Sequence, residues 1–518
     1  MGDFIGNSKH EVTISRLHTT EQQAQSAFDF INNDHTPVMS DTDSGITIVN
    51  DKDYTAQLTL EMESLDVKDK SVIVPPPMNI CIIIVGTRGD VEPFIAIGKR
   101  LKKDGHRIRL ATHAVYRSMV LDGGLEFYPL AGDPKALSAY VVKKDRTQNE
   151  VLQILQMLQD IIFSCWPAAQ ADDPENQLPP FHCNAIISNP VTYGQIHVAE
   201  KLEVPLHIMF PQPSIPTTAF PHPRTNLPYT GVNEKKNYIS YKMANSGVWH
   251  RTENMINRFR QEVLGLEKIG ENGGDILILR QIPHSFMWSR HLIPQPEDWD
   301  CSLYDVVGTV RDESVPYYVP SPNFAAFLAA GPAPIFVGFG STIIADATKI
   351  TNMILEAAIR AKVRVVIQPS WSGLAQGGTF KIPSSVFILG DCPHDWLFPH
   401  MAAVVHHGGA GTTAAGLLAG KPTFIISIND DQPFWGWAVT QAGVGVQTCP
   451  MAQLTTPILT EAFKALLQPQ LVERALAMKS LMEAEDGVEN AVHSFYSHLP
   501  EPKPNSRRGR DRKRTQYP

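Results

Sequence analysis

The chain has 518 residues, which is enough for two ordinary domains with sizeable cores. Its formal net charge of -8 argues against a nucleic-acid-binding body. The six cysteines are scattered without a C-x-x-C pair, which indicates a reduced intracellular protein and neither a disulfide scaffold nor a zinc module. The N-terminus lacks the apolar core of a signal peptide, and no apolar run approaches the ~20 residues of a membrane span. We therefore expect a cytoplasmic protein, at most peripheral on membranes.

The first segment, residues 1–77, is polar, has neither helical nor strand periodicity and ends in three prolines. We interpret it as a largely disordered extension. It contains Asp41-Thr42-Asp43, which has the form of a metal-binding DxD motif. Because this motif falls in a segment without predicted structure, we attribute it to chance.

From residue 78 onward, short apolar runs alternate with helical patterns. The first half predicts strands at 79–85, 107–112, 185–188 and 206–210 and helices at 91–103 and 193–202. After the proline-rich stretch 317–322, strands are predicted at 335–339, 364–368, 386–389, 403–405 and 423–427, and late helices at about 456–467 and 486–499. This alternation predicts an α/β fold of two doubly wound domains, at 78–315 and 325–500, with the late helices closing the second domain or packing back on the first.

The last segment, residues 501–518, carries a basic run at 507–514. Three readings are open: a solvated disordered tail, attraction to an anionic membrane surface, or a nuclear-import signal. The solvated tail is the default among them.

An apolar strand meets a glycine-rich turn that opens a helix in the segment VVHHGGAGTT, residues 404–413. Glycines let the backbone approach an anion, and the free amides of the first helical turn point at the same place. Thr412 and Thr413 can add hydroxyl donors, and His407 can add a ring N–H or a positive charge. The turn therefore predicts a diphosphate site, although a simple helix cap has the same form.

A carboxylate and an amide, Asp431 and Gln432, follow the next predicted strand. They fall at the carboxyl edge of the sheet, where open α/β sheets bind ligands. Phosphate contacts followed by this pair suit a nucleotide whose diphosphate carries a sugar.

Asp90 lies at the corresponding position of the first domain, directly after its first predicted strand. At this position Asp90 could also be the N-cap of a helix that begins at Val91.

A set of short motifs then carries a family resemblance. In chain order they are GTRGDVEP (86–93), LATH (110–113), GLEFYPLAGDP (124–134), VGFGS (337–341), PHDWLFP (393–399), HHGGAGT (406–412) and DQPFW (431–435). Together they resemble the sterol 3-beta-glucosyltransferases of the UDP-glycosyltransferase superfamily, in the fungal type without its N-terminal lipid-binding modules. The resemblance spans about residues 78–500 and implies the GT-B fold, in which two Rossmann-like domains, one for the acceptor and one for the UDP-sugar, face a cleft.

The resemblance also implies roles for single residues. Asp90 matches the general base that takes the proton of the acceptor hydroxyl. The residues matched to UDP-sugar binding are Gly86, Thr87, Arg88, Ser341, Cys392, His394, His407, Gly409, Gly411, Thr412, Asp431 and Gln432. Plant members of the superfamily place a ribose-binding glutamate where this chain has Ala415, so the ribose contact is expected to differ. No metal and no cofactor are expected, because helix termini and His407 would stabilise the leaving UDP.

The implied function is inverting transfer of glucose from UDP-glucose to the 3-hydroxyl of a sterol. The same chemistry on a terpenoid or another lipophilic metabolite is the alternative, and a non-catalytic lipid- or nucleotide-sugar-binding protein is a third hypothesis. Expected partners are UDP-glucose, the lipophilic acceptor and a peripheral membrane contact, without nucleic acid. The region 210–229 with Trp288 and Trp299 suits either an apolar acceptor pocket or ordinary core packing.

Overall fold

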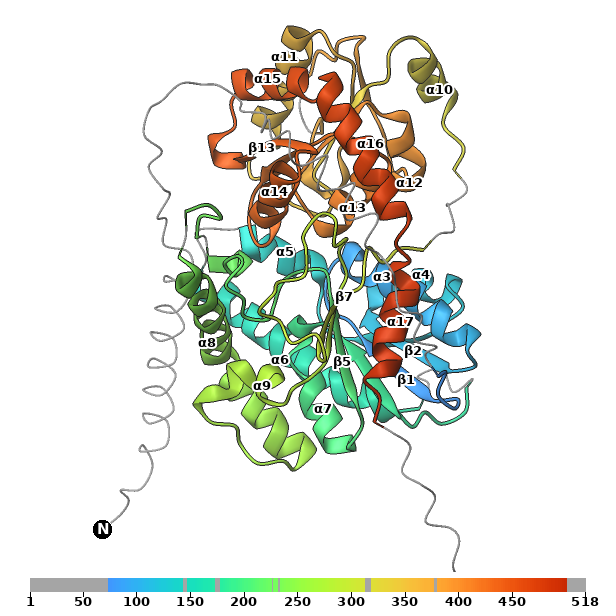
Figure 1. Ribbon diagram of the computed structural model, residues 1–518, viewed down its shortest axis with the longest axis vertical. Coiled ribbons are helices and arrows are strands. Elements are labelled where there is room, and N and C mark those ends of the chain that lie inside the picture. The colour runs from blue at the N-terminus through green and yellow to red at the C-terminus, as the bar shows by residue number, and fades with distance from the viewer. Residues whose placement is uncertain are drawn as a thin grey trace, which may run out of the picture.

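A computed structural model describes residues 73–142, 147–172, 178–225, 227–231, 233–312, 318–376 and 380–500. The extension predicted for 1–77, apart from its last residues, lies outside this part, as do Asp41-Thr42-Asp43 and the basic run at 507–514. Two α/β domains stack along the long axis of the molecule, with the N-terminal half of the chain in one and most of the C-terminal half in the other (Figure 1).

The first domain is built on a seven-stranded sheet in which every pair is parallel. Its strand order is β3-β2-β1-β4-β5-β6-β7. The strands are β1 (Asn79–Ile83), β2 (Arg107–His113), β3 (Glu126–Leu130), β4 (Ala185–Ser188), β5 (Leu206–Phe210), β6 (His284–Phe286) and β7 (Tyr304–Val306). Around β1, Ile80 and Ile82 enter the core on one face of the sheet, while Cys81 and Ile83 enter the core on the other. Burial on both faces explains the uninterrupted apolar run of this central strand.

Helices cover both faces of this sheet. They are α3 (Arg88–Lys103), α4 (Arg117–Asp122), α5 (Pro134–Val142), α6 (Gln148–Gln170), α7 (Gln195–Leu202), α8 (Glu234–Arg258) and α9 (Ile276–Leu279), with a π-helical turn at Phe259–Leu264 and short 3-10 turns at Ala114–Tyr116, Pro190–Thr192, Pro223–Thr225 and Glu271–Asp275.

The second domain repeats the plan with a six-stranded parallel sheet in the order β10-β9-β8-β11-β12-β13. Its strands are β8 (Ile335–Gly338), β9 (Val365–Gln368), β10 (Val386–Ile388), β11 (Ala403–His406), β12 (Thr423–Ser427) and β13 (Gly445–Pro450). Its helices are α10 (Pro322–Ala329), α11 (Ala347–Ala361), α12 (His394–Leu397), α13 (Ala410–Leu418), α14 (Gln432–Gln441), α15 (Thr456–Ala465) and α16 (Pro469–Glu483), with 3-10 turns at Ser370–Ser372, Phe398–His400 and Met451–Gln453. The predicted fold class, two doubly wound Rossmann-like domains in the GT-B arrangement, is confirmed.

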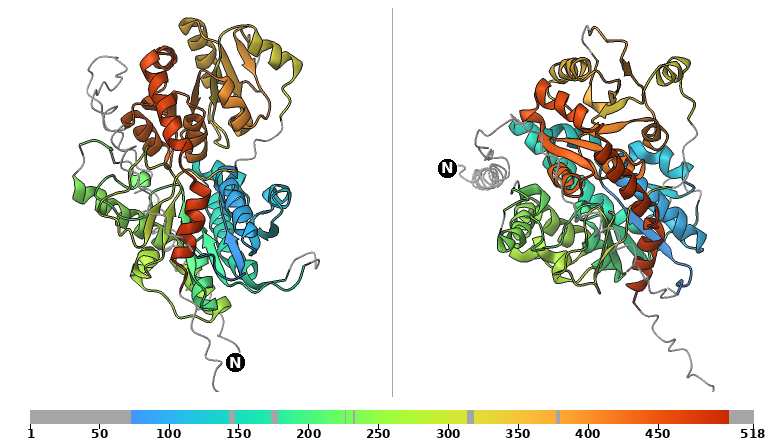
Figure 2. Two further views of the ribbon diagram at one scale, coloured as in Figure 1. Left: turned by 45° about the vertical axis from the view of Figure 1, so that its right-hand side comes forward. Right: turned by 45° about the horizontal axis from the view of Figure 1, so that its top comes forward.

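The last helix, α17 (Gly487–Ser497), leaves the second domain and packs on α3 of the first, as Figure 2 shows. Arg100 donates from Nη2 to Glu489 Oε1 at 2.8 Å, and the Tyr496 hydroxyl donates to Asp104 Oδ2 at 2.7 Å. Phe495 lies in the same core as β1. The expectation that a late helix packs back on the first domain is therefore confirmed, and α17 ties the two domains together.

An apolar core also joins the domains near the cleft. Phe220 packs edge-on against Phe434 with ring centroids 5.2 Å apart, and Tyr229 stacks on Trp437 at 5.4 Å. Trp288 and Trp299 are buried in the same cluster, and Trp288 meets Trp435 of the second domain. For these two tryptophans, the ordinary packing alternative is the correct one.

Candidate active site

Asp90 lies at the start of α3, just beyond the end of β1. Its Oδ2 accepts hydrogen bonds from the Thr87 backbone N–H at 2.7 Å and from the Thr87 hydroxyl at 3.0 Å. Gly86 has φ of 147°, and a Cβ added there would lie 2.4 Å from Asp90 Oδ2, so only glycine fits against this carboxylate. The N-cap reading of Asp90 is wrong: Thr87 is the N-cap, α3 begins at Arg88 instead of Val91, and Asp90 completes the capping box from the third helical position.

The surroundings of Asp90 favour a basic carboxylate. Burial raises its pKa, the two hydrogen bonds from Thr87 lower it, and among nearby charges Asp430 raises it while Arg224 lowers it. A half-buried carboxylate with a raised pKa is a stronger base than one in water, which suits proton abstraction from an alcohol.

Two more carboxylates approach from the second domain, at the start of α14. Asp431 is buried and accepts from Trp435 Nε1 at 2.7 Å. Burial, Asp430 and Asp90 raise the pKa of Asp431 to about 7 against the hydrogen bond from Trp435. Asp430 has a positive φ of 52° and pairs with Arg224 of the first domain, with Nε and Oδ1 3.5 Å apart. Sequence reasoning did not single out Arg224 or Asp430, because their pairing appears only when the domains dock.

Gln432 stands beside them but is engaged by its own loop. Its Oε1 accepts from the backbone N–H groups of Ile428 at 2.7 Å and Asn429 at 3.1 Å, and its Nε2 donates to Asn429 Oδ1 at 3.0 Å. This network fixes the turn between β12 and α14, so the amide orders the loop that presents Asp431. A direct contact between Gln432 and a sugar stays a prediction.

The glycine-rich turn between β11 and α13 holds the ring of His407 between two glycines. A Cβ on Gly340 would lie 3.2 Å from His407 Cε1, and one on Gly409 would lie 2.6 Å from Nε2. His407 Nδ1 is buried and has no hydrogen-bond partner in the described part of the chain. Burial lowers the pKa of His407 to about 4, so the ring is neutral near pH 7 and offers an N–H without a positive charge.

The first turn of α13 has room for a ligand. Among the described residues no side chain caps this helix, and a Cβ added at Gly411 would meet no atom within 4 Å. Amides that lack intrahelical partners and the positive end of the helix dipole suit an anion. Thr413 does not contribute, because its hydroxyl donates to Gly409 O at 3.0 Å and its side chain is buried. Thr412 remains half-exposed at this turn.

The segment around Cys392 and His394 forms another wall of the site. Gln368 Nε2 donates to Cys392 O at 3.3 Å and to Gly390 O at 3.2 Å, and the His394 ring stacks on Phe398 with centroids 4.4 Å apart. Burial, His407 and Arg88 lower the pKa of His394 to about 4, so the charge of Arg88, from the first domain, acts on this segment. Gln368 was not predicted as a site residue, although it holds the loop that contains Cys392, one of the residues matched to UDP-sugar binding.

Ser341 follows β8 and faces the first domain. Its backbone carbonyl accepts from the Ser138 hydroxyl of α5 at 3.3 Å. The structure thus gathers residues from both domains at the interface between them, with Asp90 and Arg224 from the first domain and Ser341, His394, His407 and Asp431 from the second. Their predicted contacts with a UDP-sugar stay predictions.

Within the described ranges, no three His, Cys, Asp or Glu side chains come together in a way that would hold a metal ion. That the reaction needs no metal stays a prediction. The helices of the same ranges include none that combines the length and apolar character needed to cross a membrane.

Two family matches divide the chain as the domains do. Residues 80–221 match the glycosyltransferase family 28 N-terminal domain, and residues 352–492 match the C-terminal domain of erythromycin biosynthesis protein CIII-like proteins. Among solved structures, the glycotransferase of kitacinnamycin aligns with a TM-score of 0.62 at 19% identity, over 82% of this chain and all of that one. The glycosyltransferase VinC, solved with DTDP, aligns with a TM-score of 0.52 at 16% identity, over 81% and 99%. These similarities establish the fold.

Proteins with similar sequences identify the family, which the structural similarities do not. A sterol 3-beta-glucosyltransferase of Arabidopsis thaliana is 43% identical over 449 residues, which cover 86% of this chain and 69% of that protein. A second from the same plant is 39% identical over 498 residues, covering 95% and 79%. The fungal sterol 3-beta-glucosyltransferase of Yarrowia lipolytica is 29% identical, over 82% of this chain and 29% of its own length. The expected fungal type is therefore supported only in part, since these plant proteins match better. The chain is a glycosyltransferase, and it belongs to the sterol 3-beta-glucosyltransferase family.

Proposed function

We propose that this protein transfers glucose from UDP-glucose to the 3β-hydroxyl of a sterol, with inversion at the anomeric carbon. The observation that carries the proposal is the position of Asp90 in the cleft of a family member. Its carboxylate is half-buried and has a raised pKa, and its helix, α3, contacts α13 of the second domain.

In this reaction Asp90 takes the proton of the acceptor hydroxyl as the oxygen attacks the anomeric carbon. The new bond forms between that oxygen and the carbon, and the bond from the carbon to the diphosphate breaks with its electron pair leaving on UDP. Direct displacement from the opposite side gives the β-glucoside.

The second domain stabilises the leaving group. Open amides at the start of α13 and the neutral N–H of His407 are placed to meet charge that grows on the diphosphate as UDP departs. In this proposal Asp431, whose Oδ2 accepts from Trp435, also accepts hydrogen bonds from sugar hydroxyls. A metal is not part of this proposal.

The proposed reaction has an alternative acceptor. A terpenoid or another lipophilic metabolite would use the same base and the same donor site. The deciding experiment incubates the purified protein with UDP-glucose and a matched panel of sterols, terpenoids and polyketides. We expect a sterol β-glucoside, identified by the anomeric NMR signal. An α-linked product would overturn the mechanism, a terpenoid product alone would overturn the acceptor, and no transfer to any acceptor would leave a binding protein.

A further inference from the structure

The first half of α8 exposes a stripe that mixes apolar and basic side chains. Tyr238, Ile239 and Met243 are 41%, 51% and 45% exposed. Lys235, Lys236 and Lys242 are exposed between them, and residues 235–243 include no acidic residue. We call these six residues the α8 stripe. Lys242 Nζ lies 5.7 Å from the centre of the Tyr238 ring, so charge and aromatic surface are side by side.

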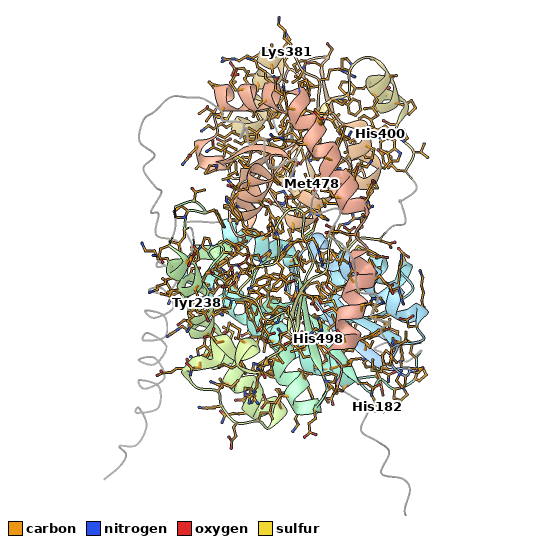
Figure 3. The ribbon with its side chains drawn as sticks, in the orientation of Figure 1. His182, Tyr238, Lys381, His400, Met478 and His498 are labelled. Atoms are coloured by element: carbon orange, nitrogen blue, oxygen red, sulfur yellow. The ribbon has the colours of Figure 1, made fainter. Side chains whose placement is uncertain are left out.

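The α8 stripe is the solvent-facing side of the helix, because the opposite side already packs against the rest of the first domain. Asn237 Nδ2 donates to Thr218 O at 2.8 Å, and the Ser240 hydroxyl accepts from the His222 backbone N–H at 2.8 Å. Tyr241 is fully buried. Since these residues fix the rotation of α8, the stripe faces solvent in the folded protein, and Figure 3 shows Tyr238 at the edge of the molecule.

The stripe also lies close to the cleft. α8 follows the loop in which Tyr229 stacks on Trp437 and Arg224 pairs with Asp430. In Figure 1 the helix runs along the flank of the first domain, beginning near the level at which the two domains meet. A surface that touches the start of α8 would therefore lie near the interface between the two domains.

We propose that the α8 stripe docks the protein on an anionic lipid bilayer. This inference rests on the proposed function for its purpose, since a sterol acceptor resides in a bilayer. Lysines keep their ammonium groups at the headgroups while their stems lie along apolar surface, and tyrosine favours the same boundary. Lipid headgroups supply negative charge for the three lysines, and the acyl boundary takes Ile239 and Met243. A nucleic acid would pair with the lysines alone and leave these apolar side chains in water.

The test is flotation of the full-length protein with two kinds of vesicle, phosphatidylcholine alone and phosphatidylcholine mixed with phosphatidylserine. One variant removes the charges (Lys235→Gln, Lys236→Gln and Lys242→Gln), and another removes the apolar contact (Ile239→Ser and Met243→Ser). A control variant carries Lys349→Gln and Ile359→Ser on α11, where Lys349 is exposed and Ile359 is 60% exposed. All proteins keep the basic C-terminal run, so its contribution is constant.

We expect the charge variant to bind anionic vesicles roughly 10- to 100-fold more weakly at low salt, with the difference shrinking as salt rises. The apolar variant should also bind more weakly, and the α11 control should bind like the wild type. Equal flotation of all four proteins would overturn the proposal. Unchanged flotation with loss of self-association in ultracentrifugation would overturn it in favour of a second copy of this chain as the occupant.

Measurements of glucosyl transfer distinguish failure of membrane docking from failure of the proposed function. Both α8 variants should glucosylate detergent-dispersed sterol at the wild-type rate and vesicle-embedded sterol more slowly. If the wild type glucosylates neither, the proposed function fails, while the flotation result still decides whether the stripe binds lipid. Equal melting temperatures show that the variants are folded.

Discussion

Arg224 Nε and Asp430 Oδ1 lie 3.5 Å apart and form an ion pair between the two domains beside Asp90. The two residues act on Asp90 in opposite directions, because Asp430 raises the pKa of Asp90 and Arg224 lowers it. The pair is about 40% exposed on each side, so its value for stability is small, on the order of 1 kcal/mol or less. Its larger consequence is electrostatic, since its two charges adjust the pKa of Asp90, which burial and the Thr87 hydrogen bonds mainly determine.

Substitutions of this pair should shift the pH dependence of kcat/KM in opposite directions. The base acts as a carboxylate, so activity rises with pH through its pKa. Arg224→Gln removes the charge that lowers the pKa of Asp90 and should move the acidic limb of the profile to higher pH. Asp430→Asn removes the charge that raises it and should move the limb to lower pH. Asparagine tolerates the positive φ at position 430, so the backbone is preserved. Limbs that move the same way would contradict this account.

Asp90→Asn should lower kcat by ~10²–10⁴-fold, the usual contribution of a general base. The amide oxygen can still accept from the Thr87 N–H, so α3 and the melting temperature should change little. UDP affinity, measured by calorimetry, should be unchanged, because the base acts on the acceptor. Glu92→Gln is the matched control: this exposed carboxylate, two residues further along α3, pairs with Arg88 at 2.6 Å and should be dispensable for kcat. A loss of only a few-fold in Asp90→Asn would reject Asp90 as the base.

Much of the fold was predictable because the central strands are buried on both faces. The strands β1, β4 and β11 are apolar except for one terminal residue each (Asn79, Ser188 and His406), and the apolar runs located them within two residues. β6 and β7 were missed because each has only three residues and includes polar ones, His284 and Ser285 in β6 and Asp305 in β7. Their pairing depends on the neighbouring strand and not on local pattern.

In the candidate site, too, local sequence pattern could be predicted and contacts between distant residues could not. The turn around His407 and Gly409 was found because its glycines and its strand–helix setting are contiguous in the chain. Arg224 and Asp430 were missed because they come from different domains, and nothing near either residue indicates the other. The engagement of Gln432 by its own loop was hidden for a related reason, since the acceptor and donor geometry of an amide is known only in the folded turn.

The contact between His407 and Gly409 provides a third prediction. His407→Ala should weaken UDP binding about 10-fold or more, because it removes the ring N–H that the proposed function assigns to the diphosphate. Gly409→Ala should weaken UDP binding in the same way while His407 is kept. The added Cβ would lie 2.6 Å from His407 Nε2 and force the ring aside. The double variant should bind UDP no more weakly than His407→Ala alone. Thr413→Val is the control, because its hydroxyl bonds to Gly409 O; calorimetry should find its UDP affinity near the wild type, and additive losses in the double variant would refute the shared mechanism.

The last prediction concerns Glu485, which lies between α16 and α17, where the chain crosses from the second domain to the first. Its Oε1 accepts from the Ser289 hydroxyl at 3.1 Å and from the Arg290 backbone N–H at 3.2 Å, and His291 Nε2 lies 3.8 Å away. Burial raises the pKa of Glu485 to about 7, against the lowering effect of those hydrogen bonds and of Arg290. The unfolded chain has the ordinary value of 4.5, so the folded protein binds the proton more tightly and its stability falls as pH rises from about 4.5 to about 7. At about 1.4 kcal/mol per pKa unit, this loss amounts to about 3 kcal/mol.

Glu485→Gln lacks the titrating carboxylate and should not undergo that loss. The melting temperature of the variant relative to the wild type should therefore rise between about pH 5 and about pH 8, as the wild type acquires a buried charge and the variant does not. Glu483→Gln is the control, because this carboxylate is 48% exposed beside Lys479 and its removal should leave the pH trend of the wild type in place. Parallel melting curves for Glu485→Gln and the wild type across this range would mean that Glu485 is already charged at low pH and that burial does not govern its protonation.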